Sequence, residues 1–129
     1  MPDDLVGRYL DCLRRGEPDA MLSLFTDDAI VHSPLYGTLP AAQFYPRLFS
    51  DTQQSTLHLR RTFRDGESSI AFWFDFDWVL GDGTPAPFSV VDVAELDPSG
   101  RISTLHIVYD TVGIRDAFRA ATGHESTGI

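Results

Sequence analysis

The sequence has one cysteine, few basic residues and no long apolar run, and each shortage excludes a class of protein. Cys12 is the only cysteine in 129 residues, so neither an intrachain disulfide nor a cysteine cluster for zinc can form. Ten Lys and Arg against 19 Asp and Glu give a formal net charge of -9. This balance argues against nucleic acid and membrane surfaces as partners, because both attract basic faces. No stretch approaches the ~20 apolar residues of a membrane span.

Targeting, repeat and metal-binding signals are also lacking. The opening MPDDLVGRYL does not have the basic-then-apolar layout of a signal peptide, so we expect a cytoplasmic protein. The four histidines, at 32, 58, 106 and 124, show no metal-ligand spacing, and we predict no metal site. Without repeats or linkers, the 43% hydrophobic content predicts a single domain over residues 1–121, with a flexible tail at 122–129.

The first half of the chain is helical in pattern. Apolar residues recur at helical spacing from Leu5 to Leu13, and Arg14-Arg15-Gly16 is a stop signal. A second short helix begins at Glu17-Pro18 and ends at Asp27-Asp28. Ala29–His32 is a candidate short strand. A third helix is predicted at Ala41–Phe49, shortened or kinked by Pro46.

The second half changes to a period of two, which is typical of strands. Four strands and a closing helix are predicted, at Thr56–Phe63, Ser69–Leu80, Phe88–Leu96, Arg101–Tyr109 and Val112–Ala121. Helices followed by a strand meander favour an α+β domain. We therefore expect a cone-shaped, curved mixed or antiparallel β-sheet wrapped around the N-terminal helices. The aromatic face of the long strand would line the open end of the cone.

One acidic residue stands in an apolar strand. By alternation Asp92 shares its face with Phe88, Val90 and Ala94. A carboxyl in such surroundings loses solvation, which raises its pKa and makes it a candidate acid or base. The alternative is a structural aspartate that is bonded to nearby backbone or exposed at a sheet edge.

Six segments spread along the chain carry a family resemblance: Gly7–Leu10, Gly16–Met21, Leu24–Ala29, His32–Pro34, Val91–Ile102 and Tyr109–Thr111. They resemble the nuclear transport factor 2-like superfamily, and within it the SnoaL-like proteins and ketosteroid isomerases. The resemblance implies a cystatin-like α+β barrel with a small-molecule pocket, and a homodimer formed through the outer face of the sheet. It does not fix one chemistry, because a fold hosts many functions.

The resemblance to ketosteroid isomerases is partial. Tyr9 falls where that family has its oxyanion-hole tyrosine, and Asp92 where it has a protonated aspartic acid. Ser33 replaces the general-base aspartate. His32, beside that vacant position, is a candidate base if a bend turns it inward. The candidate catalytic residues are therefore Asp92, Tyr9 and His32.

Two functions remain open at this point. One is a cofactor-free isomerase, cyclase or hydrolase acting on an apolar carbonyl or epoxide compound. The other is a non-catalytic module that binds a small apolar ligand or forms dimers, as the missing base suggests. In both, the pocket-lining residues are expected to be Leu13, Phe25, Phe44, Leu48, Phe72, Phe74, Phe76, Trp78, Phe88, Val90, Leu105 and Tyr109.

Overall fold

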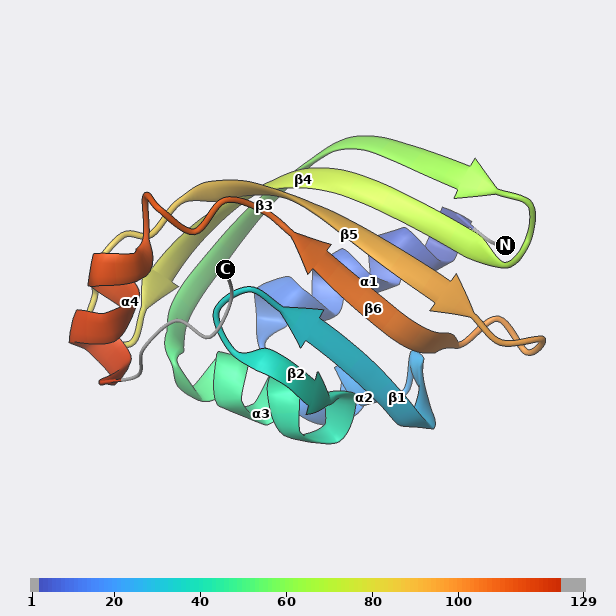
Figure 1. Cartoon of the computed structure of the whole chain (residues 1–129), viewed down its shortest axis with the longest axis horizontal. Coiled ribbons are helices and arrows are strands. Elements are labelled where there is room, and N and C mark those ends of the chain that lie inside the picture. Colours follow the sequence, from blue (N-terminus) through green and yellow to red (C-terminus); the bar gives the residue numbers. More distant parts are fainter. Residues whose placement is uncertain (1–2, 124–129) are drawn as a thin grey trace.

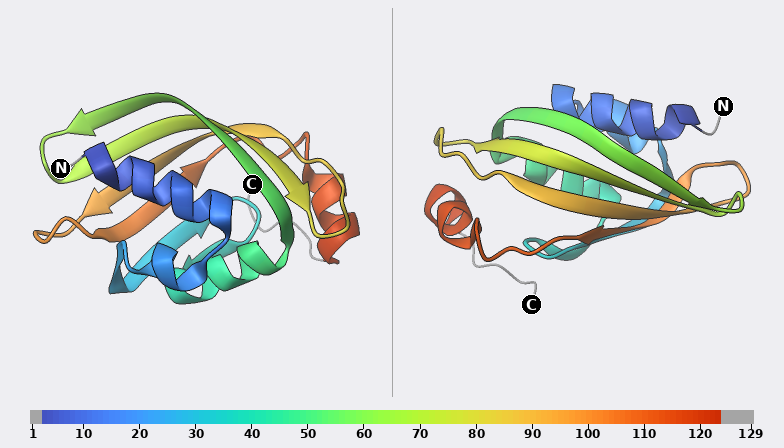
Figure 2. Two further views of the ribbon diagram at one scale, coloured as in Figure 1. Left: turned by 180° about the vertical axis from the view of Figure 1, so that it is seen from behind. Right: turned by 90° about the horizontal axis from the view of Figure 1, so that it is seen from above.

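The computed structural model describes residues 3–123 as one curved sheet with three helices on the same face (Figure 1, Figure 2). A fourth helix lies at one end of the sheet. In chain order the elements are α1 (Asp3–Arg15), α2 (Pro18–Leu22), β1 (Phe25–Ser33), β2 (Gly37–Pro40), α3 (Ala41–Ser50), β3 (Thr52–Asp65), β4 (Ser69–Leu80), β5 (Phe88–Leu96), β6 (Ile102–Val108) and α4 (Arg115–Thr122).

The sheet is mixed and does not close on itself. Its strand order is β2-β1-β6-β5-β4-β3, and β1 pairs with β6 in parallel while the other neighbours are antiparallel. Helices α1, α2 and α3 cover the inner face (Figure 2). The predicted α+β architecture, a curved sheet wrapped around N-terminal helices, is confirmed.

Alternation along β4 decides which side chains form the core. Phe72, Phe74, Phe76 and Trp78 are each at most 5% exposed, whereas Trp73 on the other face is 36% exposed. Since burial of one large apolar side chain contributes about 1.5–3 kcal/mol, this face anchors the sheet to the helices. The bounds of β4 and β5 agree with the predicted strands.

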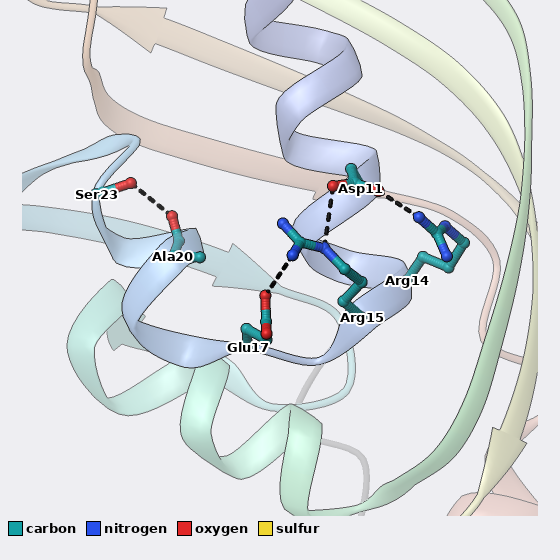
Figure 3. Close-up of polar contacts among 6 residues, drawn as sticks. All are labelled: Asp11, Arg14, Arg15, Glu17, Ala20 and Ser23. Carbon is teal, nitrogen blue, oxygen red and sulfur yellow. Dashed lines mark hydrogen bonds and ion pairs between the residues drawn. The ribbon is translucent and has the colours of Figure 1, made fainter.

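Polar contacts fix the junction between α1 and α2 (Figure 3). Gly16 ends α1 with φ +67°, a conformation that glycine adopts without strain. Arg15 contacts Asp11 at 3.0 Å and Glu17 at 2.8 Å. Arg14 also pairs with Asp11. These exposed ion pairs lie where the chain turns from α1 into α2, and both helices lie on the sheet (Figure 2).

Some element bounds differ from the predictions. Helix α2 ends at Leu22, earlier than expected, because the Ser23 hydroxyl donates to the carbonyl of Ala20 and Phe25 already pairs with Ile102 on β6. Strand β2 was not predicted. Helix α4 begins at Arg115 and not at Val112, since residues 111–114 form a turn. The predicted tail, 122–129, starts at the last residue of α4, and residues 124–129 lie outside the described part.

Candidate functional site

A cavity lies between the inner face of the sheet and helices α1 and α3. Its volume is about 40 Å³. That is room for about three waters. Most of its wall is apolar and aromatic. The lining residues are Tyr9, Leu13, Ser33, Leu35, Tyr36, Phe44, Leu48, Phe74, Phe76, Trp78, Phe88, Val90, Asp92, Ile107 and Tyr109.

Asp92 brings a carboxyl group into this apolar wall. It lies on β5, between Phe72 of β4 and Ile107 of β6, and is 2% exposed. Among residues 3–123, no hydrogen-bonding partner reaches its Oδ1 atom. Burial raises the pKa of Asp92 to about 8, although the Tyr9 hydroxyl lowers it in part. At neutral pH the group is therefore mostly protonated and can donate a hydrogen bond.

Two tyrosine hydroxyls meet beside this carboxyl. The Tyr9 hydroxyl on α1 and the Tyr45 hydroxyl on α3 are 2.8 Å apart, and either can be the donor. Burial raises the pKa of both tyrosines well above its usual value, and the nearby Asp92 adds to this increase. When Tyr45 donates, the Tyr9 hydrogen stays available for a ligand or for Asp92.

Tyr45 was missed as a site residue by the sequence reasoning. The available signal was its position beside Phe44 on the apolar face of the predicted helix at 41–49. That pattern predicts burial of Tyr45. It does not predict that a second tyrosine from α1 lies opposite, because the contact depends on how two helices dock on one sheet.

Ser33 stands where the resemblance to ketosteroid isomerases would place a general-base aspartate, and it faces the cavity. Its Oγ atom accepts hydrogen bonds from the backbone N–H groups of Leu35 at 3.2 Å and Tyr36 at 3.1 Å. This hydroxyl therefore holds the turn between β1 and β2. Ser33 has no carboxyl with which to remove a proton from carbon.

His32 points away from the cavity, so the inward bend on which its role as a base depended is not present. Its ring stacks on His106 of the neighbouring strand, with centroids 4.5 Å apart and planes 8° apart. Its Nδ1 atom lies 3.0 Å from the Thr38 hydroxyl. Strict alternation along β1 places Ser33 on the inner face and His32 on the outer face. We therefore remove His32 from the candidate catalytic residues.

Most of the expected pocket residues line the cavity. The exceptions are Phe25, Phe72 and Leu105, which are buried in the adjoining core. Phe25 and Phe72 contact the Tyr9 ring and so support the site from behind. The wall also includes residues that were not expected, namely Ser33, Leu35, Tyr36 and Ile107.

Tyr36 contributes a polar group that is already paired. Its hydroxyl donates to the Asp51 carboxylate at 2.7 Å. Burial and this hydrogen bond raise the pKa of Tyr36 well above its usual range. Tyr36 thus presents its ring to the cavity and directs its hydroxyl toward the end of α3.

Within residues 3–123 no group of three or more His, Cys, Asp or Glu side chains is arranged to hold a metal ion. No helix in this range is long and apolar enough to cross a membrane.

Similar folds occur among solved structures. The chain superposes with a TM-score of 0.75 and 16% identity on the epoxide hydrolase/cyclase-like enzyme SalBIII, which has a role in pyran ring formation in salinomycin; the match covers 87% of this chain and 92% of that one. For TerC, co-crystallised with polyporic acid, the TM-score is 0.74 and the identity is 17%. The match covers 92% of this chain and 98% of that one. A nuclear transport factor 2-like protein of unknown function from Exiguobacterium sp. 255-15 superposes with a TM-score of 0.69 and 19% identity. The match covers 82% of this chain and 98% of that one.

These likenesses confirm the predicted fold. The match of the sequence to a family model assigns the family more narrowly than the fold does. Residues 6–105, which include Tyr9, Ser33, Tyr45 and Asp92, match the model of the SnoaL-like domain. The match spans most of the chain and contains every polar group of the cavity except Tyr109. The protein therefore belongs to the SnoaL-like domain family.

Proposed function

We propose that the protein is a cofactor-free enzyme in which protonated Asp92 acts as an acid on a small apolar carbonyl or epoxide compound. The observation that carries this proposal is the buried carboxyl of Asp92, whose Oδ1 atom has no partner among the described residues and which forms part of a cavity wall. An unpaired buried polar atom is costly, and such atoms are concentrated at functional sites.

The chemistry follows from the groups that meet at this wall. Asp92 would donate to the oxygen of the ligand, and the Tyr9 hydroxyl, when it accepts from Tyr45, would supply a second hydrogen bond. Among the described lining residues, Asp92 alone has a carboxyl group. The reaction must therefore need only one acid, which gives up a proton and later regains one.

Opening of an epoxide meets this condition. The proton of Asp92 passes to the epoxide oxygen as the carbon–oxygen bond breaks, and water or an internal hydroxyl attacks the carbon. The proton released by that nucleophile returns to the Asp92 carboxylate, so the enzyme is restored. The likeness to the epoxide hydrolase/cyclase-like enzyme SalBIII supports this class of reaction. The net charge of -9 and the apolar wall favour an uncharged ligand.

The second candidate is a ligand-binding or dimerising module without catalysis. Two observations favour it. The cavity is small, with a volume of about 40 Å³, and the Ser33 hydroxyl already accepts hydrogen bonds from the backbone of the turn. In that case Asp92 would bind the oxygen of a ligand that leaves unchanged.

Hydrolysis of propylene oxide, which is small enough for the cavity, distinguishes the two candidates. We expect the protein to accelerate hydrolysis, and Asp92→Asn to lose at least about 100-fold of the protein-dependent rate, the lower end for general acid catalysis. Because the acting form is protonated and the pKa of Asp92 is about 8, the rate should fall as the pH rises through 8. Product formation is followed by proton NMR.

Asp77→Asn is the matched control, since Asp77 is an exposed carboxyl on β4 and should leave the rate unchanged. Retention of the wild-type rate by Asp92→Asn would exclude Asp92 as the acid. Binding of propylene oxide without turnover, lost in Asp92→Asn, would support the binding module.

We also propose that two copies associate through the outer face of the sheet, as the resemblance implied. Trp73, Phe63 and Val108 are exposed, and Trp73 and Phe63 lie on that face. The cytoplasmic location expected from the sequence stays a prediction.

A further inference from the structure

The cavity around Asp92 is too small for a ligand with an aromatic ring. Room for about three waters matches a molecule of the size of acetone or propylene oxide. A larger ligand therefore needs a wall that can yield. Most of the wall is built from strands β4 and β5 and from helices α1 and α3, which are held by the sheet hydrogen bonds and by the core.

Helix α4 supports a different part of the wall. It lies at the end of the sheet (Figure 1) and outside residues 6–105, which match the family model. Of its eight residues, all described, only Phe118 is buried, with 0% exposure. Helix α4 thus inserts a single fully buried aromatic side chain at the end of the sheet.

Phe118 stands directly behind two residues of the cavity wall. Its ring centroid is 5.2 Å from that of Tyr36, with planes at 81°, and 6.1 Å from that of Trp78, with planes at 34°. Both Tyr36 and Trp78 line the cavity. As long as Phe118 fills the space behind them, neither ring can move outward.

The accessible side of the cavity lies near the same helix. Phe88, Ile107 and Tyr109 are half-buried lining residues, and Phe88 stacks on Tyr109 at 4.2 Å. Tyr109 is followed at once by the turn that leads into α4. A ligand that enters beside Tyr109 and reaches Asp92 would therefore extend toward the wall that Phe118 supports.

We propose that Phe118 determines ligand size at the Asp92 cavity by blocking the outward movement of Tyr36 and Trp78. This inference rests on the proposed function only in so far as the cavity binds a carbonyl or epoxide compound. It predicts that removal of the Phe118 ring admits aromatic ketones, with the ring of the ligand in the space vacated by the side chain.

The test compares acetone with acetophenone, which share a methyl ketone and differ by a phenyl ring. Binding is measured from methyl shifts of Leu13, Leu48 and Val90 during titration. We expect Phe118→Ala to bind acetophenone at least about 10-fold more tightly than the wild type does, and to bind acetone within about two-fold. The milder Phe118→Leu, which should fold even if Phe118→Ala does not, is expected to show the same trend with a smaller change.

Ile70→Ala is the matched control. Ile70 is 1% exposed on β4 and does not line the cavity, so its truncation also removes buried volume but at another place. We expect its affinity for acetophenone to equal that of the wild type. An equal gain in Ile70→Ala would mean general loosening of the core and would overturn the role of Phe118.

The remaining outcomes separate this inference from the proposed function. Tight binding of acetophenone by the wild type, unchanged in Phe118→Ala and Phe118→Leu, would overturn size selection while leaving the cavity as a ligand site. Failure of every variant to bind either ketone would overturn both. Gain of acetophenone binding together with unchanged epoxide hydrolysis in Asp92→Asn would support Phe118 and overturn the acid role of Asp92.

Discussion

At the scale of single residues, Asp92 is a buried acid whose ionisation opposes folding. In the folded protein its pKa is about 8, compared with a reference value of 3.8. The folded state therefore holds a proton that the unfolded chain releases near pH 4. Stability from this group is present below the unfolded pKa and is lost as the pH rises from about 4 to 8.

Replacement of Asp92 by Asn should remove this pH dependence. Between pH 5 and pH 8 we expect the wild type to lose on the order of 3 kcal/mol of unfolding free energy relative to Asp92→Asn, from a shift of about four pKa units. Urea unfolding of both proteins at the two pH values measures the difference. Asp77→Asn should follow the wild type. Parallel pH profiles for wild type and Asp92→Asn would show that Asp92 is solvated in solution.

At the scale of secondary-structure elements, the Thr52 hydroxyl links α3, β3 and β4 beside the cavity. Thr52, at the start of β3, donates to the carbonyl of Leu48 in α3 at 2.6 Å. It also accepts from the indole N–H of Trp78 on β4 at 2.8 Å. Trp78 is 2% exposed, so its N–H depends on this partner. Thr52 thereby orients a residue of the cavity wall against the end of a helix.

Thr52→Val keeps the shape of this residue but removes the hydroxyl. We expect a loss of about 1–2 kcal/mol in unfolding free energy, because a buried N–H is left without an acceptor. Thr52→Ser, which retains both hydrogen bonds, should lose less. Denaturant unfolding gives the energies, and the Trp78 indole N–H shift in NMR spectra reports the bond. An indole shift that is equal in Thr52→Val and the wild type would contradict this role.

At the scale of the whole molecule, the outer face of the sheet is the surface that the helices on the inner face leave uncovered. Phe63, Ala71 and Val93 are paired in one row across β3, β4 and β5, and His106 and His32 continue that row across β6 and β1. Phe63 is 52% exposed. Exposed apolar side chains grouped on one face are typical of contact surfaces.

We expect the protein to form a dimer, which sediments at twice the mass of the chain. The substitution Trp73→Glu should weaken self-association at least about 10-fold. Each copy has a formal net charge of -9, so association should strengthen with added salt, which screens the repulsion. Sedimentation equilibrium at two salt concentrations measures both effects. Val112→Glu, at a 70% exposed position outside the strands, is the control. A monomeric wild type at all salt concentrations would contradict the proposed dimer.

Sequence alternation predicted strands β4 and β5 and the side chains that they bury. Alternation in residues 69–80 and 88–96 set the aromatic inner face and placed Asp92 among apolar neighbours, because successive strand residues point to opposite faces. The same rule allowed only one of His32 and Ser33 to face inward. Helix starts and ends were less accurate, since Ser23 and the turn at 111–114 act through hydrogen bonds that the pattern does not contain.

Which side chains meet across elements depends on the tertiary structure. The hydroxyl pair of Tyr9 and Tyr45, the choice of Ser33 over His32, and the insertion of Phe118 behind Trp78 depend on how helices dock on the curved sheet. Sequence spacing fixes directions within one helix or strand. The distances between elements, and with them the size of the cavity, follow from the packing of many side chains at once.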